Sequence, residues 1–209
     1  IELWRAEEIH NGKALTTVNR DITALRSALS KAVDWEIIAS HPLKKLKQIK
    51  TDYRGVVRYL TVDEERRLRN ALNEREQKLR DERASANQWR RERNYPMLPE
   101  LSKDTYADHL KPMVLLTINT GLRRKELFSL QWHHVDFNSA TATITWGTNK
   151  SSKTRYIPLN IEAINILKNW RTQTESDDLI FCNSEGNSFT HCKRAWATAL
   201  QLAAIKKFR

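Results

Sequence analysis

Apolar residues recur every three or four positions along most of the chain, which is the spacing of a buried face on an α-helix. The clearest case lies between residues 16 and 33, where Val18, Ile22 and Leu25 share one face and Thr16 or Thr17 is placed to cap the start. The same spacing predicts further helices over residues 1–11, 61–79, 105–120, 160–170 and 190–203. Most of the chain is therefore expected to be helical.

Polar residues stand where several of these helices should begin. Thr61 followed by Glu64 matches a capping box, in which the hydroxyl accepts a helix N–H and the glutamate accepts the N–H of the cap residue. Asn160 and Thr190 are placed to cap the last two helices. These residues define the expected helix starts more sharply than the apolar spacing does.

Two stretches show a β pattern instead. Residues 140–146 read ATATITW and residues 154–159 read TRYIPL, so both are rich in β-branched and aromatic side chains, and a polar turn separates them. They predict an antiparallel hairpin that carries lysines at its tip, and residues 179–181 predict one more short strand. The expected fold class is mainly α with a small antiparallel β-sheet.

The apolar spacing lapses around Gly55, which predicts a domain boundary. We expect a helical domain over residues 1–52, a linker over 53–60 and a second domain over 61–209. Within the second domain, residues 74–103 carry mixed charge with few apolar side chains, and they predict a projecting helical hairpin or a mobile insertion. This insertion could touch DNA or a neighbouring subunit, or it could be a solvated charged helix.

The chain has 209 residues, a formal net charge of +11 and basic side chains in nearly every segment. Such an excess favours a polyanionic partner, double-stranded DNA first, although a merely basic protein has the same composition. The two cysteines, Cys182 and Cys192, show no metal-binding or disulfide spacing. No apolar run is long enough to span a membrane and no signal peptide is recognisable, so we expect a cytoplasmic protein. Because the chain starts at Ile1, we also expect it to be part of a longer one.

One junction combines these signals. Residues 120–132 read TGLRRKELFSLQW and follow the apolar run 112–118, so a glycine and an arginine stand between two buried helices. Packing would fix the stem of Arg123 and hold its guanidinium at one point, which suits the binding of a phosphate. The alternative is a glycine helix stop beside an incidental surface arginine.

This junction and the hairpin together resemble the tyrosine recombinases of the phage integrase family. The resemblance rests on residues 120–132 and on residues 149–159, NKSSKTRYIPL, which occur in the expected order and setting. Residues 13–50 resemble the helical, SAM-like core-binding domain of that family, and residues 59–64 resemble the entry to its catalytic domain. The resemblance implies a DNA-binding core domain over 1–52 and a partial catalytic domain over 61–209.

The resemblance also implies a chemistry. A tyrosine attacks a DNA phosphodiester to form a 3′-phosphotyrosine, and a DNA 5′-hydroxyl later resolves it, without metal or nucleotide cofactor. Arg123 matches the arginine that stabilises the non-bridging oxygens, and Lys150 matches the lysine that acts as general acid, with Lys153 as its competitor. Glu126 is expected to orient Arg123, or to be an ordinary pairing carboxylate.

DNA contacts and assembly are further expectations. We expect the full-length family member to form a tetramer on double-stranded DNA. Candidate DNA-binding side chains are the exposed cations of both domains: Arg20, Arg26, Lys31, Lys44, Lys45, Lys47, Arg124, Lys153 and Arg155.

The end of the chain departs from the family pattern. A His-x-x-Arg box and the nucleophilic tyrosine should follow the last helix, but the sequence stops at Arg209. His191 and Arg194 have the right spacing at the start of that helix, where we interpret them as a coincidental match. We therefore name no nucleophile among the five tyrosines and expect DNA binding without cleavage. A non-catalytic DNA-binding protein of the same fold is the main alternative, and an RNA-binding protein is a weaker one.

Overall fold

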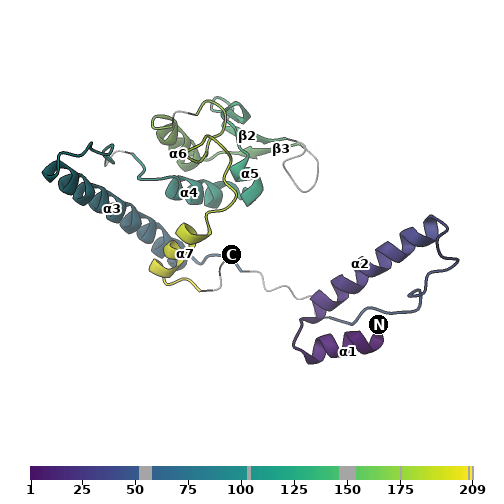
Figure 1. The fold of residues 1–209 in the computed structure, drawn as a ribbon. Coiled ribbons are helices and arrows are strands. Elements are labelled where there is room, and N and C mark those ends of the chain that lie inside the picture. The colour runs from purple at the N-terminus through teal and green to yellow at the C-terminus, as the bar shows by residue number, and fades with distance from the viewer. Residues whose placement is uncertain (52–57, 103–104, 146–153, 175, 207, 209) are drawn as a thin grey trace. The chain divides into compact units, whose positions relative to one another are not determined.

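A computed structural model describes residues 1–51, 58–102, 105–145, 154–174, 176–206 and 208. The chain forms two compact units, Ile1–Val57 and Arg58–Arg209 (Figure 1). The described residues are mostly helical and contain one three-stranded antiparallel sheet. The predicted fold class is therefore confirmed. Within the described ranges, no helix combines the length and the apolar character needed to cross a membrane.

The first unit contains helices α1 (Glu2–His10) and α2 (Leu15–Asp34), followed by an irregular segment over residues 41–50. Asn19 fastens this segment, because its side-chain amide donates to the Ile49 carbonyl and its side-chain oxygen accepts the Ile49 amide, at 2.8 and 2.9 Å. Two expectations were wrong here. Helix α2 is capped by Ala14 without a side-chain bond, not by Thr16 or Thr17. Leu25 was expected on the buried face with Val18 and Ile22, but it is 41% exposed. The buried residues of α2 all lie in the N-terminal half of the helix.

The second unit is built around one apolar core. Helices α4 (Leu110–Thr120) and α6 (Ile161–Arg171) pack against each other, and α7 (Lys193–Leu202) packs on the first half of α3 (Val62–Glu92). The sheet orders β1 (Val135–Asp136), β2 (Thr141–Ile144) and β3 (Arg155–Pro158) side by side, after the short helices α5 (Arg124–Phe128) and η1 (Trp132–His134). Burial of apolar side chains from all these layers is the main stabilising term.

Several predicted boundaries hold and others move. The capping box of Thr61 and Glu64 is present, and Asn160 caps α6 through the Ala163 amide at 2.8 Å. The predicted hairpin pairs Thr141 with Pro158 and Ile144 with Arg155, although its tip, with Lys150 and Lys153, lies outside the described residues. Helix α7 starts after Cys192 rather than at Thr190, and α4 starts at Leu110 rather than at residue 105.

The sheet also differs from expectation at both of its ends. Val135 and Asp136 form an edge strand, β1, which the sequence pattern did not predict. Residues 179–181 make only a single bridge, between Leu179 and Gln131, instead of a strand.

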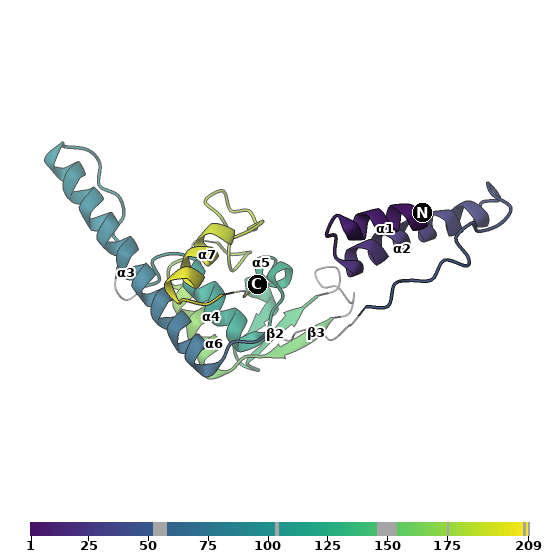
Figure 2. The same ribbon diagram turned by 90° about the horizontal axis from the view of Figure 1, so that it is seen from below.

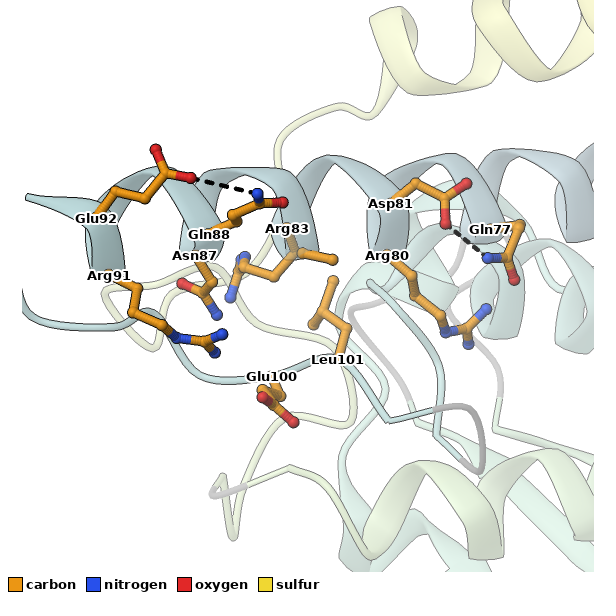
Figure 3. A pocket seen from close by; sticks show the side chains of 11 residues that line it. Gln77, Arg80, Asp81, Arg83, Asn87, Gln88, Arg91, Glu92, Glu100 and Leu101 are labelled. Carbon is orange, nitrogen blue, oxygen red and sulfur yellow. Dashed lines mark hydrogen bonds between the residues drawn. The ribbon is translucent and has the colours of Figure 1, made fainter.

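The charged stretch 74–103 belongs largely to one long helix. It is the second half of α3 plus a segment, residues 95–102, that returns along the helix; we call residues 77–102 the arm. In two views α3 extends past the other helices of its unit (Figures 1 and 2). A hollow of about 680 Å³ lies between the helix and the returning segment (Figure 3).

Side chains of one helix face hold the returning segment in place. Arg83 donates to the Pro99 carbonyl at 2.6 Å and Arg90 to the Pro96 carbonyl at 3.0 Å. Asn87, which is 4% exposed, donates to the Leu98 carbonyl and accepts its amide. Arg80 donates to the carbonyls of Ser102 and Thr105. These residues follow the helical repeat, so one face of this charged helix binds the returning segment, while most side chains on its other faces are exposed.

Candidate active site

The junction between α4 and α5 is a sharp helix stop. Gly121 follows the last residue of α4 with φ 64° and ψ 22°, a left-handed conformation, and its amide donates to the Thr117 carbonyl at 2.8 Å. The backbone is then extended at Arg123 before α5 begins, and Leu122 between them is buried. The glycine and the buried leucine therefore determine where the Arg123 side chain emerges.

We expect Gly121→Ala to lower the free energy of unfolding by about 1–2 kcal/mol, because an L residue is strained at this positive φ. No atom lies within 4 Å of the position that the added Cβ would occupy, so the cost comes from the backbone alone. Urea denaturation measures it. Gly121→Asn should cost less, because asparagine tolerates the left-handed region better than alanine. Equal costs for the two variants would contradict this explanation.

Glu126 is the centre of the site. It is 1% exposed, and its two carboxylate oxygens accept three bonds. Oε1 accepts from the Arg123 guanidinium at 2.9 Å, and Oε2 accepts from the Arg123 amide at 2.8 Å and from the Arg155 guanidinium at 2.6 Å. One buried carboxylate thus links the α4–α5 junction to the first residue of strand β3, at the loop end of its pairing with β2.

The environment of Glu126 keeps it ionised. Burial by itself would raise the pKa of Glu126, but the bonds from the Arg123 amide and guanidinium and the charge of Arg155 outweigh it. The resulting pKa lies below the ordinary glutamate value. Glu126 is therefore a fixed negative charge near neutral pH and is a poor proton donor.

The two arginines keep donors free for a ligand. The side chains of Arg123 and Arg155 are 55% and 39% exposed, and each gives Glu126 only one guanidinium bond. One carboxylate against two guanidiniums leaves the cluster with a net positive charge. The Nε of Arg155 is buried and has no acceptor among the residues that the structure describes. Such a pair of partly exposed forks can bind the oxygens of a phosphate.

The structure describes only some of the remaining candidate residues of this domain. Arg124 is exposed on α5, and its charge opposes the burial that raises the pKa of the Cys192 thiol at the start of α7. Lys150 and Lys153 lie outside the described residues, so their distances to Arg123 are not part of the structure. His191 and Arg194 are exposed near the N-terminus of α7.

The basic residues of the first unit divide into two groups. Arg26 donates to the Leu46 carbonyl at 3.1 Å, and Lys31, although 65% exposed, pairs with Asp34 at 3.2 Å, so both make contacts inside the unit. Arg20 is 78% exposed, with Asp21 at 4.0 Å. The lysines of the irregular segment, Lys44, Lys45 and Lys47, are also exposed. The exposed group forms the stronger candidates for DNA contacts.

The contact between Glu126 and Arg155 could not be found by local sequence reasoning. The two residues are 29 positions apart, and the sequence suggested Arg155 only as one of many surface cations. The register of the hairpin could have indicated this contact. Arg155 starts the strand that pairs with β2, and it lies opposite Ile144, which is buried.

Comparisons with known proteins bear on this site. The model of the Phage integrase family matches residues 89–208, more than half of the chain. A Haemophilus influenzae protein named Putative integrase/recombinase is 26% identical over 179 residues, which cover 85% of this chain and 42% of that protein. The integrase of Shigella phage Sf6 is 25% identical over 115 residues, 50% of this chain and 30% of that one. The chain spans less than half the length of these curated relatives.

Solved structures share the fold at low sequence identity. A lambda integrase dimer bound to a COC' core site has a TM-score of 0.63 and 16% identity, over 97% of this chain and 63% of that chain. The Tn1549 transposon integrase in complex with circular intermediate DNA has a TM-score of 0.58 and 18% identity, over 95% and 61%. Together with the family match over residues 89–208, this shows that the chain belongs to the phage integrase family.

Proposed function

We propose that this protein acts in site-specific DNA recombination, by cleaving and rejoining DNA strands through a 3′-phosphotyrosine intermediate. The observation that carries the proposal is the cluster of Arg123, Glu126 and Arg155 at the family's glycine–arginine junction. A DNA phosphodiester is the ligand that suits two partly exposed guanidiniums around one fixed carboxylate.

Arg123 stabilises the non-bridging oxygens as negative charge develops in the transition state. Glu126 orients Arg123 and stays ionised, so it positions rather than transfers a proton. Lys150 protonates the departing 5′ oxygen, with Lys153 as the alternative proton donor. Both lysines lie in the chain between β2 and β3, and the first residue of β3, Arg155, is tied to Glu126; this tie supports a shared site.

The two units divide the work of binding DNA. The first unit serves as the core-binding domain and the second as the partial catalytic domain. The lambda and Tn1549 integrase structures both contain DNA, and another lambda integrase structure is a tetramer bound to a Holliday junction. We extend duplex DNA binding to this chain on the strength of its +11 charge, and assembly into a tetramer on DNA to the full-length protein.

Residues 1–209 should bind DNA without cutting it. Tyr156 is the described tyrosine adjacent in the chain to the cluster; it is 73% exposed on β3, where alternation directs it away from Arg155. Incubation with a suicide DNA substrate should therefore give no covalent protein–DNA adduct. An adduct would locate a nucleophile within these residues and overturn this expectation.

Binding to duplex DNA should weaken steeply with salt, and Arg123→Ala should weaken it further. Loss of one phosphate contact removes about 0.9 from the slope of log affinity against log salt concentration. Fluorescence anisotropy over a salt series measures both quantities. Arg66→Ala is the matched control, because it removes a charge that is 72% exposed and paired with Asp63 far from the cluster in sequence. Equal slopes for the two variants would show that Arg123 does not contact phosphate.

A further inference from the structure

Among the described residues, one face of the arm makes no side-chain hydrogen bond to the returning segment and contacts it through the stacking of Trp89 on Tyr95. Glu82, Ser85, Ala86, Trp89 and Arg93 follow the helical repeat and share this face, which we call the outer stripe. Arg80, Arg83, Asn87 and Arg90, which bind the returning segment, follow the helical repeat along another side of the helix, and Figure 3 draws the first three of them. The outer stripe is therefore a separate surface.

The distal end of the outer stripe is an exposed aromatic cluster. Trp89 is 49% exposed and stacks on Tyr95, with ring centroids 5.6 Å apart and planes 15° from parallel. The Arg93 guanidinium lies 4.5 Å from the Trp89 ring centroid. Trp, Tyr and Arg are the side chains most enriched at energetically important protein–protein contacts. The bonds of Asn87 and Arg90 to the returning segment fix this cluster in place before any partner binds.

The proximal part of the same stripe borders a hollow. The hollow has a volume of about 340 Å³ and lies beside Glu82 and Ala86. Leu79, Leu101 and Ala107 contribute apolar lining, and Arg83 and Asp108 complete it. An exposed tryptophan and a partly apolar hollow thus occur on one helix, three residues apart.

We propose that the outer stripe is a contact surface for a second copy of this chain, with the two α3 helices antiparallel about a two-fold axis. If Glu82 faces Arg93 of the partner subunit, then Ala86 faces the partner subunit's Trp89. Both pairs have one register, because Ala86 lies four residues after Glu82 and Trp89 lies four residues before Arg93. In this arrangement the Glu82 carboxylate lies opposite the partner's Arg93 guanidinium, and the small Ala86, beside the hollow, lies opposite the large ring of the partner's Trp89. Each pair occurs twice because of the two-fold symmetry.

The charges favour a second copy over DNA. The stripe has a carboxylate at one end, Glu82, which is 60% exposed and lies 3.9 Å from the Lys78 ammonium, and a cation at the other, Arg93, which is 48% exposed and lies 3.6 Å from the Glu92 carboxylate. Asp81 and Glu92 add negative charge next to the stripe, which repels phosphate, and Arg80, Arg83 and Arg90 are engaged with backbone carbonyls. Both pairs within the chain are exposed and therefore weak, so in the antiparallel orientation Glu82 can pair with Arg93 of the partner subunit instead.

The contact is weak by itself. One pair of helices of this length buries less than the ~800 Å² per partner of a standard interface. Two copies held on one DNA molecule would raise the effective concentration and favour the pairing. In free solution we expect association only toward the upper end of a concentration series that reaches about 1 mM.

Charge reversal tests the register directly by sedimentation equilibrium. Glu82→Arg alone and Arg93→Glu alone each place like charges opposite one another at two symmetric positions, and should weaken dimerisation roughly tenfold. The double variant restores both pairs and should recover the wild-type dimerisation constant. Trp89→Ala should abolish association. Arg91→Glu, a charge change on the side of the helix that faces the hollow of Figure 3, should leave it unchanged.

Three results would overturn the proposal. The first is a chain that stays monomeric up to about 1 mM. The second is a dimer that is indifferent to both single reversals, because its contact would then lie elsewhere. The third is a change in DNA affinity alone, tighter for Glu82→Arg and weaker for Arg93→Glu, which would assign the stripe to DNA. Circular dichroism melting of each variant shows whether the fold is kept, and the recovery by the double variant cannot arise from unfolding.

Discussion

Glu126→Ala should lower the free energy of unfolding by about 2–4 kcal/mol. The change leaves the Arg123 amide and one donor of each guanidinium without their acceptor, and it removes the only charge that separates two neighbouring cations within the cluster. The cost stays below that of a fully buried pair because both guanidiniums reach water. Urea denaturation followed by circular dichroism measures the loss.

A surface glutamate provides the control for this loss. Glu162 pairs with Arg69 but is 41% exposed, so Glu162→Ala should cost no more than about 1 kcal/mol. If the two variants lose the same stability, the buried bonds of Glu126 stabilise the fold no more than a surface ion pair does, and the proposed bridging role of Glu126 is wrong.

The pH dependence gives a second test of the same residue. The pKa of Glu126 is lowered in the folded state, so its ionised form adds stability that is fully present above the ordinary value of 4.5 and is lost as the pH falls toward the folded-state pKa. Glu126→Gln lacks this contribution at every pH. The stability difference between the wild type and Glu126→Gln should therefore shrink on acidification below 4.5, and a difference that grows would contradict the lowered pKa.

The sequence pattern correctly predicted those helix ends that are determined by hydrogen bonds between residues close in the chain. The capping box at Thr61, the Asn160 cap and the helix stop at Gly121 each depend on residues three or four positions apart, and each has the predicted form. The spacing of Arg123 and Glu126 belongs to the same class, since the pair closes over three residues. Thr190 failed as a cap because several polar residues compete near that helix start, and sequence alone does not rank them.

Contacts between distant segments could not be predicted in this way. The link from Glu126 to Arg155 depends on the register of β3 against β2, which periodicity leaves open. The arm shows the same limit: alternating charges suggested a solvated helix, whereas the arginines bind carbonyls of a segment that approaches only in the folded chain. Arginine has a long apolar stem and five donors, so it can serve either purpose, and the type of residue alone does not decide.

Glu76→Ala should be the most destabilising single change, at about 3–5 kcal/mol, because it breaks a buried ion pair and leaves a cation behind. Glu76 is 3% exposed; it accepts the Lys111 ammonium at 2.6 Å and the Ala107 amide at 3.0 Å, with Arg80 at 3.8 Å. These bonds tie α3, where the arm begins, to the start of α4, the helix that ends at Gly121. Thermal unfolding measures the loss as a fall in melting temperature.

Two further variants separate charge from hydrogen bonding at Glu76. Glu76→Gln keeps an acceptor for Ala107 and Lys111 but removes the charge, so it should cost less than Glu76→Ala. Glu76→Leu combined with Lys111→Met removes both charges and fills the space, and it should recover much of the loss, because apolar pairs often replace buried ion pairs at little cost. If the double variant is no more stable than Glu76→Ala, the bond to the Ala107 amide carries the stability, and the ion pair with Lys111 is secondary.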